Sequence, residues 1–212
     1  PMAEETALTV AQGPAAIAEY RNPAKYNALL PAVLDAGSSA AFNVRLAVHR
    51  IANFDPTTGG EIYHGTSMAQ GQFALTKNSL NRLATTAGIT WDHEAEGWEK
   101  GPGGEDLFRA VAILKGPDGS PLHFPARAPV EWMMEVWDGQ GPNKRKIPKK
   151  DPFALRKCES KARNAAIRAA LGVKQTYSLD ELHKPFVVPR TVLALDKMLE
   201  DTEVRKFLVA TA

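Results

Sequence analysis

Residues 107–128 read LFRAVAILKGPDGSPLHFPARA, and this order of residue types predicts a β-hairpin. Side chains alternate between the two faces of a strand. One face of the first strand, over 107–115, carries Phe108, Ala110, Ala112 and Leu114, and the other carries Arg109, Val111, Ile113 and Lys115. Turn-forming residues occupy 116–119, and Leu122, Phe124 and Ala126 then alternate with His123 and Arg127 over 121–128.

A long helix is predicted C-terminal to this hairpin, over residues 152–171. Asp151 suits the N-cap, Pro152 the first helical position, and Gly172 the left-handed stop. At 100° per residue, one side collects small or apolar residues, namely Leu155, Cys158, Ala162, Ala165, Ala166 and Ala169. Their small volume allows a sheet or helix to approach closely, so Ala165→Leu is expected to destabilise the fold.

A second stripe of the same helix is basic: Lys157, Lys161, Asn164 and Arg168 follow one another at helical spacing. The net charge of the chain is only +2, but ten Lys or Arg lie between Lys144 and Arg168 against Asp151 and Glu159. Cations one turn apart lie about 6 Å apart, comparable to the phosphate repeat of an extended strand. A polyanion partner is favoured over the alternative, a solvated basic face.

Weaker patterns fill in the rest of the chain. Alternation predicts a strand over 42–51, and a possible second strand follows over 61–64. A helix over 75–87 has Thr76 as cap and Gly88 as stop, and a short helix is plausible over 22–34. The aromatic stretch 130–137, with Trp132 and Trp137, is interpreted as a buried helix turn or strand in preference to a base-stacking platform.

Length and composition define the broad class. The 212 residues with 44% hydrophobic content fit one domain with appendages: an N-terminal arm over 1–24, a core over 25–190 and a C-terminal helical segment over 191–212. That last segment packs on its own core or on a neighbouring subunit. A cytoplasmic location is expected, because neither a secretory signal nor an apolar run long enough to cross a membrane is found.

Signatures of catalysis are weak. Cys158 is the only cysteine, which excludes an internal disulfide, and its position in a helix favours a packed thiol over a reactive one. The glycine-rich run 101–104 is not followed by Lys-Ser or Lys-Thr, so no phosphate-binding Walker loop is present. Six acids between Asp92 and Asp106 keep a Mg²⁺-dependent nuclease as an alternative function.

The order of these predicted elements resembles that of phage-type single-strand annealing proteins. It consists of a helix (TKNSLNRLATTAGI), a hairpin (FRAVAILKGPDGSPLHFPA), and a basic helix with its tail (ESKARNAAIRAALGVKQTYSLDELHKPFVVPR). The closest similarity lies over Glu159–Arg190, and the resemblance covers roughly residues 70–190. A β-hairpin followed by a long basic helix is also similar to the core shared by the phage RecT, Redβ and Erf proteins and the eukaryotic Rad annealing protein.

The resemblance implies an α+β fold, with a small antiparallel sheet whose β-hairpin packs on a long basic helix and with additional flanking helices. It implies ATP-independent binding and annealing of single-stranded DNA in recombination and repair, by rings or helical filaments of a homo-oligomer. The single-stranded DNA would lie between the hairpin and the helix. No cofactor is expected; a phage exonuclease or a host single-strand-binding protein is a possible partner, in the cytoplasm of a bacterial host. A phage structural or adaptor oligomer is a further alternative.

The expected phosphate contacts are all basic. They comprise Arg156, Lys157, Lys161, Arg163 and Arg168 on the helix, Arg109, Lys115 and Arg127 on the hairpin, and Lys144, Arg145, Lys146, Lys149 and Lys150 between them. The stretch 144–150 matches no motif of the family and fits a mobile loop that can still hold DNA.

Overall fold

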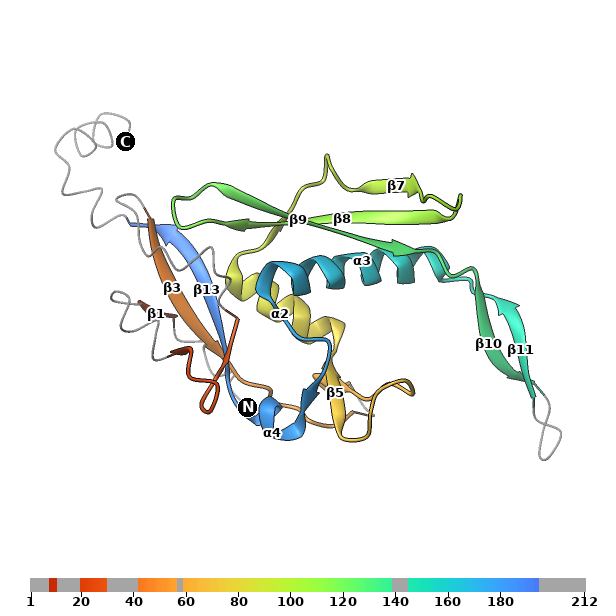
Figure 1. The fold of residues 1–212 in the computed structure, drawn as a ribbon, viewed down its shortest axis with the longest axis horizontal. Helices are drawn as coiled ribbons and strands as arrows, with labels where there is room; N and C mark the ends of the chain where they lie inside the picture. The colour runs from red at the N-terminus through yellow and green to blue at the C-terminus, as the bar shows by residue number, and fades with distance from the viewer. Residues whose placement is uncertain (1–7, 11–19, 30–41, 57–58, 139–144, 195–212) are drawn as a thin grey trace.

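The computed structural model describes residues 8–10, 20–29, 42–56, 59–138 and 145–194. In these ranges the chain forms three helices and several small, mostly antiparallel sheets, which confirms the expected mixed α/β class (Figure 1). None of the helices in the described part is long and apolar enough to cross a membrane.

The predicted hairpin is confirmed. It consists of β8 (Asp106–Lys115) and β9 (Pro121–Pro129), which pair in register from Leu107 opposite Pro129 to Lys115 opposite Pro121. The other edge of β8 pairs with β6 (Thr90–Trp91) and β7 (Gly97–Lys100). At the hairpin turn Gly119 has a φ of 85°, and a Cβ there would lie 2.3 Å from the ring of Phe42. Only glycine therefore fits this turn without a shift of the phenyl ring.

Helix α3 (Ala154–Leu171) lies along β8 and β9 (Figure 1). A stripe of small residues on α3 packs against the apolar face of the hairpin. The contacting residues are Cys158, Ala162, Ala166 and Ala170 on the helix and Phe108, Ala110, Ala112 and Ala128 on the strands. The Cys158 thiol donates a hydrogen bond to the Ala128 carbonyl at 3.0 Å, and burial raises the pKa of this thiol. The expected packed cysteine is confirmed.

Two details of the α3 prediction are wrong. The helix begins at Ala154 with Phe153 as N-cap, because Asp151 accepts the Phe153 N–H at 2.9 Å in a turn that precedes the helix. Leu155, Ala165 and Ala169 are exposed, not packed. The helix instead buries a second side, with Ile167 and Leu171, against the remaining core. The left-handed stop at Gly172, with a φ of 67°, is confirmed.

Helix α2 (Lys77–Ala87) forms as predicted: the Thr76 side chain caps its N-terminus, and Gly88 ends it in the left-handed conformation. Its apolar side joins Leu80 and Leu83 to Ile167 and Leu171 of α3 in the larger of the core clusters. The two helices therefore pack on each other only along part of their surfaces, and the polar side of α2 is left for other contacts.

A second sheet has the order β1-β3-β13-β2. Its strands are β1 (Leu8–Val10), β3 (Phe42–His49), β13 (Phe186–Leu193) and β2 (Asn27–Ala28), with β2 parallel to β13. The predicted strand at 42–51 is confirmed. The helix predicted from residue 22 is wrong over 22–29, because Asn22 makes a turn and Asn27 donates its amide to the carbonyls of Glu181 and Lys184.

The remaining elements are short. A three-stranded sheet has the order β12-β5-β4, with β4 (Ile62–Tyr63), β5 (Gln72–Leu75) and β12 (Tyr177–Ser178). Helix α4 (Leu179–His183) begins with a capping box between Ser178 and Glu181. The strand predicted at 61–64 is confirmed in its two central residues. Of the C-terminal segment predicted over 191–212, residues 191–193 belong to β13, and residues 195–212 lie outside the described part.

The last two strands, β10 (Met133–Asp138) and β11 (Arg145–Lys150), pair antiparallel to form a separate two-stranded sheet, here called the ribbon. It leaves the body where β9 ends and α3 begins and projects away from the other sheets (Figure 1). The basic stretch interpreted as a loop therefore forms a strand over 145–150.

A buried ionic cluster stabilises the loop that follows β3. Glu61 accepts the backbone N–H groups of Ala52 and Asn53, at 2.5 and 3.1 Å, and pairs with Arg82 at 2.6 Å. His49 lies 3.8 Å from the same carboxylate, with its side chain only 12% exposed. Burial lowers the pKa of His49, and this effect outweighs the opposing charge of Glu61.

The first prediction concerns the stripe of small residues on α3. We expect Ala166→Leu to lower the free energy of unfolding by about 1–3 kcal/mol, because Ala166 is fully buried against the hairpin and a larger side chain forces the elements apart. Ala165→Leu is the matched control: it adds the same atoms to an exposed position of the same helix. Urea unfolding of both variants measures the difference, and equal losses would show that α3 does not pack as described.

The second prediction concerns His49 and the pH dependence of stability. Its pKa is lower in the folded state than its ordinary value of 6.5, so the unfolded chain takes up a proton first as the pH falls. We expect the free energy of unfolding to decrease from about pH 7.5 to pH 5, and His49→Gln to remove part of that decrease. His93→Gln, at a side chain that is 77% exposed, is the control that should keep it. Urea unfolding across this pH range decides between them.

Candidate nucleic-acid interface

The ribbon, together with Trp132 directly before β10, presents aromatic and cationic side chains. In its register Trp137 lies opposite Lys146, and Met133 lies opposite Lys150. The Lys146 ammonium lies 5.6 Å from the ring centroid of Trp137, and that of Lys150 lies 6.0 Å from the ring centroid of Trp132. These three apolar side chains are 42% (Trp132), 56% (Met133) and 59% (Trp137) exposed. Indole rings beside ammonium groups provide both partners that a nucleotide needs, a stacking surface and a positive charge.

This exposure overturns the interpretation of residues 130–137 as a buried segment. The stretch is a strand, but its only extended partner among the described elements is the polar strand β11, which covers neither face. The sequence contained a signal for this arrangement: the turn-forming residues 138–143, DGQGPN, separate two runs that each suit a strand.

The ribbon also has a surplus of positive charge. Its strands hold Arg145, Lys146, Lys149 and Lys150 against Glu135 and Asp138. Lys146 pairs with Glu135 at 3.0 Å, whereas Arg145 and Lys149 form no ion pair with any residue in the described part of the chain. All four cations are exposed. Lys144, which was predicted with them, lies outside the described residues.

Two lysines predicted as phosphate contacts connect the base of the ribbon to α3. Lys157 pairs with Asp151 at 2.6 Å, directly after β11, and Lys161 pairs with Glu131 at 2.7 Å, just before β10. The hydrogen bond from Lys157, aided by the Phe153 N–H, lowers the pKa of Asp151. These pairs neutralise two of the three cations of the basic stripe and connect α3 to the segments on either side of the ribbon.

The far end of the stripe borders a hollow of about 510 Å³ on the exposed side of α3. Lys161, Asn164 and Arg168 line it from the helix, with Tyr63 and Gln175 opposite. Arg168 donates to the Gln175 side chain at 2.8 Å, so no carboxylate neutralises it there. The hollow is a positively charged surface that continues from the base of the ribbon.

The other two basic residues of α3, Arg156 and Arg163, line a different surface. Arg163 pairs with Glu96 at 3.1 Å and lies 5.6 Å from the ring centroid of Trp91. Arg156 is exposed and, with Arg163, lines a cleft between α2 and α3. The five basic residues of α3 thus divide between two surfaces instead of forming one.

The hairpin cations lie elsewhere. Arg109 and Arg127 stand opposite each other on the face of β8 and β9 that points away from α3, and Arg127 pairs with Glu99. Lys115 is exposed at the turn end of β8. Buried apolar side chains fill the contact between the hairpin and α3. A single strand of DNA therefore cannot lie directly between these two elements as the resemblance implied.

The acids between Asp92 and Asp106 are mostly in ion pairs. Asp92 lies near His123, Glu96 and Glu99 pair with arginines, and Asp106 pairs with Lys100 at 2.6 Å. Among the residues that the structure describes, no group of three or more His, Cys, Asp or Glu side chains is placed to hold a metal ion.

No protein-family model, curated protein or solved structure matches this chain. Sequence reasoning identified the ribbon cations but not the tryptophans beside them, and it missed the polar side of α2 altogether. Lys77, Asn81 and Thr85 follow at intervals of four residues, and this spacing was the available signal.

Proposed function

We propose that this chain binds single-stranded DNA through the ribbon and anneals complementary strands without ATP or a divalent metal. The observation that carries the proposal is the pairing of exposed indole rings with lysines, Trp137 with Lys146 and Trp132 with Lys150. Base stacking on such rings contributes about 1–3 kcal/mol per base and tolerates any sequence. The ammonium groups beside them neutralise phosphates of the same strand.

The proposed path of the strand begins on the ribbon and continues past its base to the hollow beside Arg168. Both surfaces border α3, and the residues at the base of the ribbon connect them. A protein that holds the backbone and stacks only some bases leaves the others accessible to a complementary strand. Subunits of a homo-oligomer arranged side by side would extend this support along the DNA, as the resemblance to annealing proteins suggests.

The nuclease alternative has no specific observation in its favour. Four of its six candidate carboxylates between 92 and 106 are engaged with His123, Lys100, Arg127 and Arg163. The adaptor alternative uses the same exposed ribbon for a protein contact. It differs in one measurable respect, because an apolar protein contact does not depend on counterion release.

Salt and nucleotide dependence give the third prediction. We expect affinity for an unstructured oligonucleotide to be independent of sequence and to fall steeply with salt, by roughly 0.7 log units per tenfold increase for each phosphate neutralised. Complementary strands should anneal with no ATP and with EDTA present. Fluorescence anisotropy and a quenching assay for annealing measure both. An affinity that does not change between low and physiological salt would contradict the proposal.

Replacement of ribbon residues gives the fourth prediction. Lys149→Ala with Lys150→Ala should weaken strand binding and reduce the salt slope by roughly 1.4, because two phosphate contacts are lost. Trp132→Ala should weaken binding by about 1–3 kcal/mol with little change in slope.

The charge-matched control is Lys25→Ala with Lys174→Ala, which removes the same charge from exposed sites outside the ribbon. If the control weakens binding as much as the ribbon pair does, net charge rather than the ribbon determines affinity. Circular dichroism melting checks that every variant is folded.

A further inference from the structure

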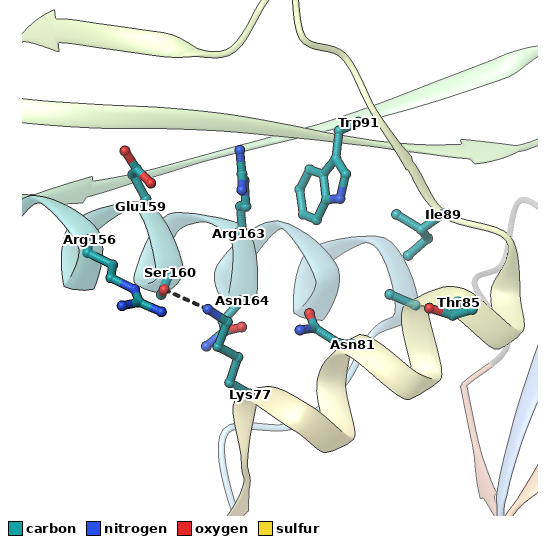
Figure 2. A pocket seen from close by; sticks show the side chains of 11 residues that line it. Lys77, Asn81, Thr85, Ile89, Trp91, Arg156, Glu159, Ser160, Arg163 and Asn164 are labelled. Carbon is teal, nitrogen blue, oxygen red and sulfur yellow. Dashed lines mark hydrogen bonds between the residues drawn. The ribbon is translucent and has the colours of Figure 1, made fainter.

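The two longer helices enclose a cleft whose walls are polar. Lys77, Asn81 and Thr85 line it from α2, and Arg156, Ser160 and Asn164 line it from α3 (Figure 2). Ile89 and Trp91 form an apolar wall at one end, and the volume is about 530 Å³. This size lies within the usual range for small-molecule sites. We refer to it as the α2–α3 cleft.

Few hydrogen bonds join the two helices across this cleft. Lys77 donates to the Ser160 hydroxyl at 3.0 Å, and this is the only bond between its walls in the described structure (Figure 2). Within the same described ranges, the amides of Asn81 and Asn164 and the guanidinium of Arg156 bond to no protein group. Helix contacts usually exclude water with apolar side chains or satisfy their polar groups mutually. Apart from Lys77 and Ser160, the polar residues that line the cleft do neither, so their donors and acceptors are available to a ligand.

The charges of the cleft favour an anion. Lys77 and Arg156 face it with Glu159 as the only carboxylate in its lining, while Arg163 is already paired with Glu96. An anionic group near Lys77 and Arg156 would restore electrical balance. A primary amide carries a donor and an acceptor side by side, which is the pattern that matches the edge of a nucleobase. Trp91 and Ile89 supply a surface for a flat ring.

We propose that the α2–α3 cleft binds one nucleoside monophosphate unit, with its phosphate at Lys77 and Arg156, its base edge at Asn81 and Asn164, and its ring against Trp91. That this unit belongs to a bound DNA strand rests on the proposed function. The cleft itself can be tested with a free nucleotide, so the two proposals fail independently.

The experiment uses the full chain with Trp98→Phe, Trp132→Phe and Trp137→Phe, which leaves Trp91 as the only tryptophan. We expect dAMP and a 20-nucleotide oligonucleotide each to quench Trp91 fluorescence saturably. Deoxyadenosine and inorganic phosphate should each bind at least about tenfold more weakly than dAMP, because each lacks half of the contacts.

In that background Asn81→Ala with Arg156→Ala should abolish the quenching by dAMP, and both positions are exposed, so folding should persist. Asn81→Asp is a second variant of the same size, whose carboxylate repels the phosphate. Lys149→Ala with Lys150→Ala should leave quenching by dAMP unchanged, because the ribbon is a separate surface.

The outcomes separate the alternatives. Absence of quenching by both dAMP and the oligonucleotide overturns the cleft proposal, while strand binding measured by anisotropy still tests the ribbon. Quenching by dAMP alone, in a variant whose binding of the oligonucleotide is still detected by anisotropy, overturns the strand as the source of the nucleotide. Deoxyadenosine binding as tightly as dAMP overturns the phosphate position, and unchanged quenching in the Asn81 and Arg156 variants overturns the assigned residues.

Discussion

Close contact between α3 and the β8–β9 hairpin is the constraint on which the rest of this structure depends. Cys158, Ala162, Ala166 and Ala170 present almost no side-chain bulk, so the helix lies directly on the strands. Once that side is fixed, Ile167 and Leu171 must face the second core, with α2 and β13. The remaining surface of α3 is then divided into the hollow beside Arg168 and the cleft beside Arg156.

The distribution of paired and unpaired charge says more about function than the number of cations does. Lys157, Lys161 and Arg163 each have a carboxylate within 3.1 Å, so much of their positive charge is balanced within the fold. Arg145 and Lys149 on the ribbon and Arg156 in the cleft have no such partner in the described part of the chain. Unbalanced charge is where a polyanion gains most, because counterions are released without breaking an existing pair.

The sequence predicted elements whose signals are local. The hairpin at 107–128, helix α2 with Thr76 and Gly88, and the stop at Gly172 depend on alternation and capping, which act over a few residues. Burial was less predictable, because alanine is compatible with either environment: Ala162 and Ala165 look alike in a helical projection, yet only Ala162 is buried. The exposure of Trp132 and Trp137 depends on which elements cover β10, which is a property of the whole fold.

Two lysines of the basic stripe on α3 contact the base of the ribbon. A two-stranded ribbon is marginally stable in water by itself, so one that exposes Trp132 and Met133 needs support at its base. The Trp132 carbonyl accepts the Asp151 N–H at 2.9 Å, and the carboxylates on either side of the ribbon, Glu131 and Asp151, are held by Lys161 and Lys157. Two of the three cations of the basic stripe, Lys157 and Lys161, are therefore paired with carboxylates that flank the ribbon. If the ribbon binds a DNA strand as proposed, loss of Lys157 or Lys161 should change the affinity through the orientation of the ribbon, without the salt dependence of a phosphate contact.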